Sequence, residues 1–257
     1  MKKILILSFL LLLIGCGKVV DILDENNGLT FEVNSKIPYT GKYKRNYENG
    51  NLQYERNYKN GKKEGVQKTY YENGILFYEG NFKGGKEEGI QRNYYENDKL
   101  RIEGNFKDGK EEGIQRNYYE NGQFKLETNI KEGERDGLYR WYYENGQLEI
   151  EENYKEGEQE GVQRKYYKNG QIEIEENFID GRRKGLRRRY DRSGNLELET
   201  NFIDGSREGL QRAYYPNGQL ESEGNFKSGE EEGVHKEYYK DGKLKSKINY
   251  KNGKKVL

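Results

Sequence analysis

A glycine recurs every 24 residues along most of this chain, with no insertion or deletion between copies. The nine positions are Gly41, Gly65, Gly89, Gly113, Gly137, Gly161, Gly185, Gly209 and Gly233. A second glycine follows nine residues later in every unit but one, where Asp98 stands in its place, and a third follows twenty residues later, from Gly61 to Gly253. Self-similarity at a fixed period is the signature of a repeat architecture, in which each unit is stabilised mainly by its neighbours. The chain is therefore predicted to be an array of nine equal units.

The glycines divide each unit into two runs of about six to eight residues that are rich in tyrosine and β-branched residues, which favours β-strands. With 35% charged residues the chain is polar enough to suggest disorder, but disordered chains are poor in aromatic residues and this one has 24 tyrosines. The segments between hairpins are short and bounded by glycine, so consecutive hairpins should continue one sheet. We predict an all-β fold: an elongated, twisted, antiparallel single-sheet meander of about nine 24-residue β-hairpin repeats.

The turn inside each unit reads Tyr-Glu-Asn-Gly in most copies, which fits a two-residue Asn-Gly turn or a three-residue loop that ends in a left-handed glycine. Pro216 discriminates between the two. In the three-residue loop it occupies the second turn position, where a φ of about −65° is required, whereas in the two-residue turn it would lack a donor for the strand ladder. We therefore predict the three-residue loop, with Asp98 in the left-handed position of its unit.

The loop also predicts which side chains share a face of the sheet, because alternate residues of a strand point to opposite faces. One face should be an apolar core face, with Val66, Tyr70, Leu76, Tyr78 and Phe82 in one unit and Ile114, Tyr118, Phe124, Leu126 and Ile130 in another. The other should be polar, with Gln67, Thr69, Tyr71, Phe77, Glu79 and Asn81. A competing register would pair Lys68 with Glu79 and Arg116 with Glu127. Exposed ion pairs contribute only about 0 to 1 kcal/mol each, so segregation of the apolar side chains is expected to prevail.

The first residues have the pattern of an export signal, in which two lysines precede an apolar run, residues 4–14, that is too short to span a membrane. Residues 13–16, Leu-Ile-Gly-Cys, resemble the lipobox of bacterial lipoproteins; the alternative is an ordinary signal peptide with a cysteine by chance. The resemblance implies cleavage before Cys16, lipidation of its thiol, anchoring in the bacterial cell envelope and, with Gly17 next, export to an outer membrane if the organism has one. Cys16 is the only cysteine, which excludes an intramolecular disulfide and a cysteine-based metal site.

The overall charge of the chain gives no sign of a polyanionic partner. Cleavage after residue 15 would remove two of the 46 basic residues and none of the 45 acidic ones, which leaves a formal charge of −1. Nucleic-acid-binding domains are usually strongly basic, so we expect no nucleic acid partner.

The repeated phrase resembles the MORN family of repeats, specifically a bacterial variant found in proteins described as antitoxin components of toxin–antitoxin systems. The matching elements are the Tyr-Tyr-x-Asn-Gly-x-Leu turn at residues 142–148, the Glu-x-Asn-aromatic-Lys strand at 103–107 and the Gly-Lys-x-x-Gly return at 109–113. Residues 29–41 are similar to the half-repeat with which lipid-anchored members begin. The departures from the pattern are Asp191, Ser193, Lys247 and Val256, and we interpret the last two as a terminal cap.

The resemblance implies three regions. They are a lipoprotein signal peptide at residues 1–15, a lipidated tether at 16–27, and a repeat domain at 28–257 with a half-repeat at 28–40 and repeats from residue 41.

The second tyrosine of each Tyr-Tyr pair is the main candidate for binding, since the predicted register places it on the solvated face beside glutamates. Tyrosine supplies large amphipathic contact area and is enriched at interfaces, although strand propensity alone also accounts for it. Successive copies lie two strands, or about 10 Å, apart and would form an extended stripe. The candidate tyrosine stripe comprises Tyr71, Tyr95, Tyr119, Tyr143, Tyr167, Tyr215 and Tyr239.

The remaining motifs do not predict a reaction. Residues 80–86 and 104–110 have the spacing of a phosphate-binding loop, but a glutamate replaces the magnesium-binding hydroxyl and no helix is expected to follow. His235 is the only histidine and is interpreted as a strand residue. Glutamates recur in unit after unit rather than in one cleft, which argues against a carboxylate-pair hydrolase.

Two further features are structural or local. Asparagine at the seventeenth place of every unit, from Asn57 to Asn249, is expected to satisfy main-chain groups at the return turn. A local basic patch consists of Arg182, Arg183, Arg187, Arg188 and Arg189.

These features predict a lipid-anchored, non-enzymatic binding scaffold of the bacterial cell envelope that holds a protein partner. We expect attachment to the membrane through lipidated Cys16, an unidentified protein partner, no cofactor, no metal and no small-molecule ligand. The alternative, which follows from the family resemblance, is an antitoxin or immunity-type protein that neutralises a partner toxin. A hydrolase that uses the repeated glutamates is a third hypothesis.

Overall fold

The computed structural model of this protein describes residues 23–26 and 28–256. The predicted signal peptide, Cys16 and most of the predicted tether lie outside these residues. The described part consists of strands and turns and contains no helix, so the predicted all-β fold is confirmed. No helix able to span a membrane occurs among the described residues.

The chain divides into two compact units, Met1–Lys86 and Glu87–Leu257. Unit 1 contains β1 (Leu23–Asn26), β2 (Leu29–Glu32), β3 (Gly41–Asn46), β4 (Leu52–Lys59), β5 (Lys62–Lys63), β6 (Gly65–Tyr70) and β7 (Leu76–Lys83). The strand β8 (Lys86–Tyr94) begins at the unit boundary. Unit 2 continues with β9 (Leu100–Lys107), β10 (Lys110–Tyr118), β11 (Phe124–Lys131), β12 (Glu134–Tyr142), β13 (Leu148–Lys155), β14 (Glu158–Gln159), β15 (Gly161–Tyr166), β16 (Ile172–Ile179), β17 (Arg182–Arg183), β18 (Gly185–Tyr190), β19 (Leu196–Ile203), β20 (Ser206–Tyr214), β21 (Leu220–Lys227), β22 (Glu230–Tyr238), β23 (Leu244–Lys251) and β24 (Lys254–Val256).

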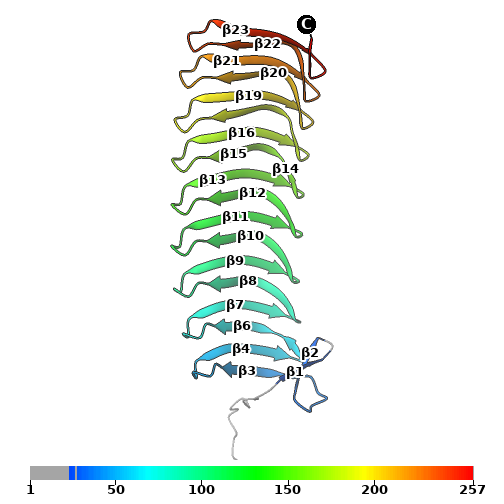
Figure 1. Ribbon diagram of the computed structural model, residues 1–257. Helices are drawn as coiled ribbons and strands as arrows, with labels where there is room; N and C mark the ends of the chain where they lie inside the picture. Colours follow the sequence, from blue (N-terminus) through cyan, green and yellow to red (C-terminus); the bar gives the residue numbers. More distant parts are fainter. Residues whose placement is uncertain (1–22, 27, 257) are drawn as a thin grey trace, which may run out of the picture. The chain divides into compact units, whose positions relative to one another are not determined.

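Within each unit the strands from β3 onward follow one another in sequence order, and each pairs antiparallel with its neighbours in that unit (Figure 1). The short strands β5, β14 and β17 are the first parts of longer strands that continue as β6, β15 and β18. At the C-terminal end β24 pairs with β23 and with no other described strand, so the sheet is open there. The predicted meander of 24-residue hairpin repeats is confirmed, and repeats are numbered here from the one that opens at Gly41.

The turn within each repeat is the predicted three-residue loop. In the second repeat the Tyr71 N–H donates to the Ile75 carbonyl (2.8 Å) and the Gly74 N–H donates to the Tyr71 carbonyl (2.9 Å). Gly74 closes the loop in the left-handed region, at φ +86°. Asp98 takes the same position in its own repeat at φ +63°, and Pro216 lies at the second position of its turn, both as predicted. These turns lie at one end of the strands, on the left in Figure 1, and this side of the sheet is called the loop edge here.

The return turns, which join one repeat to the next, lie at the opposite edge. Each is a two-residue turn in which both residues have positive φ, for example Asp108 (+53°) and Gly109 (+81°) between the paired Lys107 and Lys110. This is the type I′ geometry, which matches the twist of the flanking strands and favours glycine. The third glycine of the 24-residue period is therefore a requirement of the return turn.

The predicted strand register is wrong beyond the loop, because each hairpin contains a β-bulge. Next to the loop Tyr70 pairs with Leu76, as the three-residue loop requires. One step further Thr69 pairs with Tyr78, so Phe77 is left as the extra residue of the bulge. The same shift occurs in all nine hairpins.

The bulge produces the register that the sequence analysis rejected. Lys68 lies directly opposite Glu79, and Arg116 lies opposite Glu127. A one-residue shift moves each side chain of the second strand to the other face of the sheet. The predicted separation of apolar and polar faces therefore cannot hold.

The apolar side chains are in fact divided between the two faces. In the fourth repeat Ile114 lies opposite Asn129 on one face, whereas Ile130 lies on the other face. In the fifth repeat Leu138 and Tyr154 are separated in the same way. The single apolar surface expected from the sequence does not form.

The two faces are named here by residues that recur on them. In the fourth repeat the ladder face carries Ile114, Arg116, Tyr118, Phe124, Glu127 and Asn129. By strand alternation the glutamine face carries Gln115, Asn117, Tyr119, Leu126, Thr128 and Ile130. The glutamine face is the more buried, since Gln115, Thr128 and Ile130 are each less than one tenth exposed.

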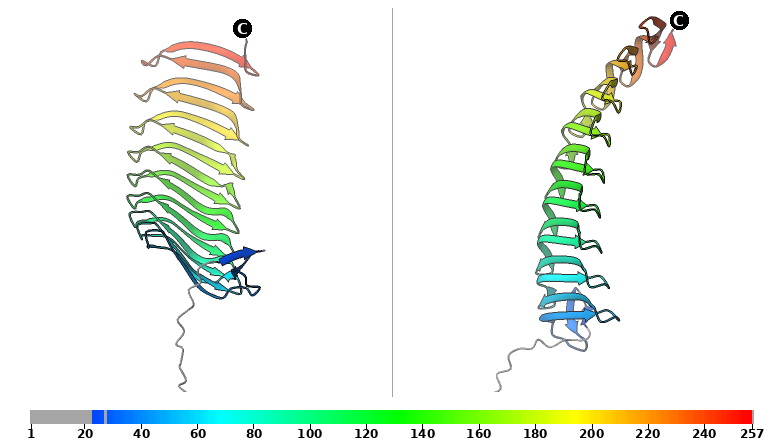
Figure 2. Two further views of the ribbon diagram at one scale, coloured as in Figure 1. Left: turned by 60° about the horizontal axis from the view of Figure 1, so that its bottom comes forward. Right: turned by 90° about the vertical axis from the view of Figure 1, so that its left-hand side faces the viewer.

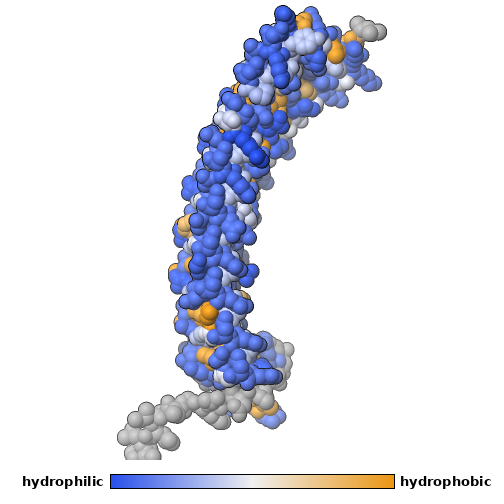
Figure 3. Space-filling view, turned by 60° about the vertical axis from the view of Figure 1, so that its left-hand side comes forward, coloured by the Kyte–Doolittle hydropathy of each residue, from blue (hydrophilic) through white to orange (hydrophobic). Residues whose placement is uncertain are grey.

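Neither unit has a thick core. In unit 2 the hairpins form one layer of curved strands, with no second layer on either face (Figure 2). No described side chain is completely buried, and the most buried ones in unit 2 mix apolar and polar types: Ile130, Phe178, Phe226, Gln91, Gln115, Thr128, Gln163 and Thr200. The side shown in Figure 3 is mostly hydrophilic, with hydrophobic atoms in small separate patches.

Unit 1 has a small aromatic core of its own. Tyr39, Tyr43 and Tyr58 are each less than one tenth exposed and pack together with Leu23. The hairpin of β1 and β2 is tied to the first repeat by a hydrogen bond from the Thr30 N–H to the Gly61 carbonyl (2.8 Å). The last residues of the predicted tether are therefore strand β1 of unit 1.

Candidate functional site

The candidate tyrosine stripe links neighbouring repeats at the loop edge. The Tyr119 hydroxyl donates to the main-chain carbonyl of Tyr142 (2.7 Å), and the Tyr143 hydroxyl donates to that of Tyr166 (2.8 Å). The same bond to the following repeat is made by Tyr95, Tyr167, Tyr215 and, in unit 1, Tyr47. These hydroxyls thus have a structural partner.

The rings of the stripe, other than the exposed ring of Tyr239, are half-buried rather than fully solvated. Burial raises the pKa of the Tyr119, Tyr143 and Tyr167 hydroxyls above the ordinary value of 10.0. Tyr71 packs its ring against Phe77, with 5.1 Å between centroids. Part of each ring remains accessible for contact.

A second link at the loop edge comes from the turn asparagine. Asn121 donates from Nδ2 to the carbonyl of Glu144 in the next loop (2.8 Å), while its Oδ1 accepts the N–H of Gln123 in its own loop (2.9 Å). Asn169 makes the equivalent bond to the Arg192 carbonyl (2.7 Å). The Tyr-x-Asn-Gly motif therefore both closes each loop and joins it to the following one.

The seventh repeat lacks both links. Asp191 replaces the tyrosine and Ser193 replaces the asparagine. The Asp191 carboxylate accepts hydrogen bonds from within its own loop, from the N–H groups of Ser193 (2.8 Å) and Asn195 (2.9 Å). The side-chain hydrogen bond from Asn195, followed by main-chain bonds, holds the pKa of Asp191 below its ordinary value. Within the described residues, no side-chain hydrogen bond runs from this loop to the eighth repeat.

A buried glutamine completes the sheet near several of the return turns, a feature that was not predicted from the sequence. Between Glu151 and Tyr154, β13 makes no ladder pair with the next strand. Gln163, only 4% exposed, fills the gap: its Nε2 donates to the Asn153 carbonyl (3.1 Å) and its Oε1 accepts the Asn153 N–H (3.0 Å). The side-chain amide thus takes the place of a main-chain amide in the ladder.

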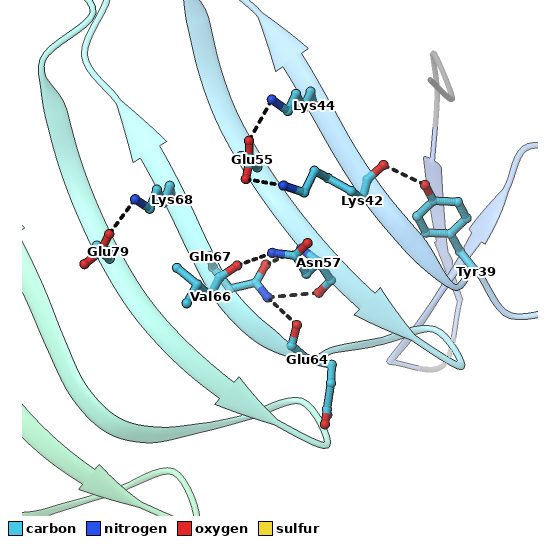
Figure 4. A network of polar contacts seen from close by, with 10 residues as sticks. All are labelled: Tyr39, Lys42, Lys44, Glu55, Asn57, Glu64, Val66, Gln67, Lys68 and Glu79. Atoms are coloured by element: carbon cyan, nitrogen blue, oxygen red, sulfur yellow. Dashed lines mark hydrogen bonds and ion pairs between the residues drawn. The ribbon is translucent and has the colours of Figure 1, made fainter. Parts of the chain in front are cut away.

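The same arrangement recurs along the glutamine face. Figure 4 shows it in unit 1, where the Gln67 amide makes both bonds to the main chain of Asn57. The bridging glutamines are Gln67, Gln163 and, through one bond from Nε2 to the Asn105 carbonyl (3.0 Å), Gln115. Gln91 and Gln211 occupy the same third position of their repeats. Their recurrence two residues after the opening glycine is the sequence signal that identifies them.

His235 occupies the bridging position in the ninth repeat. Its Nε2 lies 2.9 Å from the Asn225 carbonyl, as the glutamine nitrogen does elsewhere. The ring lies between Phe226 and Tyr250, at centroid distances of 5.6 and 4.8 Å, and Nδ1 is 3.6 Å from Glu231. In the part of the chain that the structure describes, no three His, Cys, Asp or Glu residues are placed to hold a metal.

The recurrent asparagine near the return turn satisfies main-chain carbonyls, as predicted. Its Nδ2 donates across the bulge in four repeats: Asn57 to Val66, Asn129 to Asp136 (2.6 Å), Asn177 to Lys184 (3.3 Å) and Asn201 to Glu208 (3.0 Å).

A charge ladder runs along the ladder face of unit 2, with basic and acidic residues on alternate strands. Arg116 Nε is 2.8 Å from Glu127 in its own hairpin, and Arg140 of the next hairpin is 4.0 Å from the same carboxylate. The continuous part comprises Arg92, Glu103, Arg116, Glu127, Arg140, Glu151, Arg164, Glu175 and Arg188. A second part comprises Glu199, Arg212, Glu223 and Lys236.

The contribution of these ion pairs should disappear in acid. Hydrogen bonds from Lys42 and Lys44 hold the pKa of Glu55 below its ordinary value of 4.5, and a bond from Lys236 does the same for Glu223. A carboxyl with a lowered folded-state pKa stabilises the fold above its unfolded pKa, and this is lost as the pH falls through the folded pKa. We expect Glu223→Gln to cost about 0.5–1 kcal/mol near neutral pH and close to nothing at about pH 3, measured by urea denaturation. A cost that is equal at both pH values would contradict the ion-pair origin.

Four of the five arginines of the predicted basic patch are paired with carboxylates: Arg183 and Arg187 with Glu176 (2.7 and 3.2 Å), Arg188 with Glu175 (3.8 Å) and Arg189 with Glu197 (3.0 Å). Arg182 is exposed and forms no ion pair within the described residues. A polyanion would have to displace these acidic partners.

An aliphatic row runs along the ladder face of unit 2, at the second position of each repeat. Its exposed members are Ile90 (49%), Ile114 (48%), Leu138 (45%), Val162 (45%), Leu186 (43%) and Val234 (37%). Val66 holds this position in unit 1 and is also exposed. Successive members lie two strands, or about 10 Å, apart. The row is the most extended set of exposed apolar side chains in the described part of unit 2.

The repeats match a known family. Nine consecutive segments match the family described as MORN repeat variant, at residues 39–60, 63–83, 87–108, 111–132, 135–156, 159–180, 183–204, 207–228 and 231–252. No curated protein matches the chain.

Proposed function

The chain belongs to the MORN repeat variant family, and from this premise we propose that it is a lipid-anchored, non-enzymatic binding scaffold of the bacterial cell envelope. In this proposal Cys16 carries the lipid, and the repeats hold a protein partner. The lipobox-like residues before Cys16 support the anchor, and the repeat architecture supports the scaffold.

The aliphatic row is the observation that carries the binding role. In a chain with 35% charged residues, apolar side chains recur at the second position of eight repeats and are exposed in seven of them. These residues fill no core, because the sheet is a single layer. Exposed apolar side chains that recur in a regular row along one face indicate a surface for another protein.

The neighbouring charge ladder supports a protein partner over a polyelectrolyte. Each arginine of the ladder lies beside glutamates, so the row has no net field of one sign around it. A partner that binds here gains mainly by covering apolar surface, at about 25 cal/mol for each Å².

The tyrosine stripe remains a second proposed contact surface, on the glutamine face. Since its hydroxyls bond to the next repeat, contact with a partner would use the exposed part of each ring. Tyr→Phe substitutions should therefore leave capture of a partner intact.

Substitution of the aliphatic row tests the proposal. The chain is crosslinked in its native cells and the captured proteins are identified for the unchanged protein and for Ile114→Ser/Leu138→Ser/Val162→Ser. We expect recovery of the partner to fall about 100-fold, since three half-exposed aliphatic side chains contribute roughly 1 kcal/mol each when covered.

Two isoleucines outside the row provide a matched control. Ile179 and Ile203 are 40% and 50% exposed but lie beside the return turns. Ile179→Ser/Ile203→Ser should leave capture unchanged. If both variants lose the partner equally, or neither does, the row is not the binding surface. A captured toxin that the chain neutralises would identify the protein as an antitoxin instead.

A further inference from the structure

The strand β23 is paired along its whole length with β22 on one side, but the middle of its other side pairs with no described strand. This unpaired side is called the outer edge of β23. In the interior, Ile150 and Glu151 of β13 pair with the next long strand, β15. The equivalent residues of the last repeat, Ser246 and Lys247, pair with β22 only, because β24 reaches no further than Asn249. Main-chain donors and acceptors on this edge are available to another strand.

The charge of this edge is reversed relative to every other repeat. The position held by Glu in eight repeats is Lys247 in the ninth, directly opposite Lys236 on β22. Like charges in direct opposition destabilise a strand pair, so this substitution weakens the sheet itself. The neighbouring lysines, all exposed, are Lys243, Lys245, Lys251, Lys254 and Lys255.

Among the described residues, most of these lysines have no acidic partner. Lys243 contacts Asp241 (3.2 Å) and Lys245 contacts Glu237 (3.3 Å). No ion pair is formed by Lys247, Lys251, Lys254 or Lys255 within the described residues. The edge thus differs from the basic patch of the seventh repeat, where carboxylates neutralise four of the five arginines.

The tyrosine of the loop beside this edge also lacks the hydrogen-bond acceptor that the equivalent tyrosines of other repeats have. Tyr239 is the last member of the tyrosine stripe and is 53% exposed, and no main-chain carbonyl among the described residues accepts a hydrogen bond from its hydroxyl. An added strand would supply that carbonyl.

We propose that the outer edge of β23 accepts an extended acidic segment of a partner protein as an additional antiparallel strand. In the interior, each glutamate of the charge ladder lies between basic residues on both sides. At Lys247 the same geometry requires an acidic residue on the incoming strand. Main-chain hydrogen bonds then provide affinity, and the charges provide selectivity.

A second copy of this chain is a poor occupant of the edge. The first strand of the meander, β3, is the strand that head-to-tail addition would place there, and it carries Lys42, Lys44 and Arg45. Basic residues would then face the lysines of β23. Lysines at the edge of a sheet can also prevent any strand from adding to it. The experiment below distinguishes this protective role from recognition of an acidic strand.

Peptide binding to the purified full-length protein tests the inference. The probe is a fluorescent peptide with the sequence of residues 160–167, Glu-Gly-Val-Gln-Arg-Lys-Tyr-Tyr, with both basic residues replaced by Glu; the unchanged peptide is the comparison. We expect the acidic peptide to bind about fivefold more tightly at low salt, because an opposed charge pair contributes up to about that factor. Lys247→Glu should reverse the preference, and Lys131→Glu, at an interior return turn, should not.

A methylated peptide separates strand addition from simple charge attraction. The acidic peptide with alternate main-chain amides methylated, prepared in both registers, should lose binding in at least one register. Equal binding of all these peptides, no binding of the acidic peptide, or an unchanged preference in Lys247→Glu would overturn the inference. The inference rests on the proposed scaffold function only in taking the partner to be a protein. Capture by the aliphatic row is measured with separate variants, so strand addition at β23 and capture by the row can fail independently.

Discussion

Gln163→Leu lowers the free energy of unfolding by about 2–4 kcal/mol, although leucine nearly matches glutamine in volume. The Asn153 N–H loses its acceptor, Gln163 Oε1, and a buried donor without an acceptor costs about 1–3 kcal/mol. The bond from Nε2 to the Asn153 carbonyl is lost as well, but that carbonyl keeps the Glu160 N–H at 2.8 Å. The loss therefore centres on one N–H group.

Urea denaturation gives the total loss, and hydrogen exchange of the Asn153 amide locates it. Gln171→Leu is the matched control, because Gln171 is exposed in a loop and its substitution should change stability by less than about 0.5 kcal/mol. Equal effects of the two substitutions, or unchanged protection of the Asn153 amide, would show that the bridging role is wrong.

The triple substitution Tyr119→Phe, Tyr143→Phe and Tyr167→Phe removes three hydroxyls and keeps the rings. Each hydroxyl donates to a carbonyl of the next repeat at 2.7–2.8 Å, and a hydrogen bond of this kind contributes about 0.5–1.5 kcal/mol. We expect a loss of about 2–4 kcal/mol in the free energy of unfolding.

Tyr239→Phe is the control that the chain itself offers. Its hydroxyl donates to no main-chain carbonyl among the described residues, so its removal should be neutral within about 0.5 kcal/mol. A loss in Tyr239→Phe as large as one third of the triple effect would show that the hydroxyls act by something other than inter-repeat bonds. Capture of a partner by the triple variant, measured separately, reports on the rings.

The turns of this protein could be predicted from particular residues. Pro216 fits only one of two loops, and Asp98 tolerates the left-handed position that glycine holds elsewhere. The alternation of hairpins followed from the uninterrupted 24-residue period. The turn types could therefore be predicted from the sequence, because each turn residue is constrained by its own φ angle.

The register was not predictable by the same reasoning. Phe77 and its equivalents form bulges without a special residue type to mark them, and a bulge changes the face of the whole second strand. The predicted register places the apolar side chains on one face. In a single layer neither face is covered, so gathering the apolar side chains on one face stabilises the fold little. The observed register, which divides them between the faces, allows the cross-strand Arg–Glu pairs and the bridging glutamines.

The site was partly visible in the sequence. The tyrosines were recognised as a recurrent set, but their bonds to the next repeat depend on where the following loop lies in space. The aliphatic row was assigned to a core that does not exist, and Ile114 is instead 48% exposed. Its periodicity was clear, and only its orientation was wrong.

The loop at Asp191 has a mechanical consequence. Under heat or tension, an array held together by contacts between neighbours comes apart first where a boundary has the fewest of them. On the C-terminal side of that loop, the eighth and ninth repeats can peel away as a block while the preceding hairpins keep their order. The protein would then resist pulling in two stages instead of one.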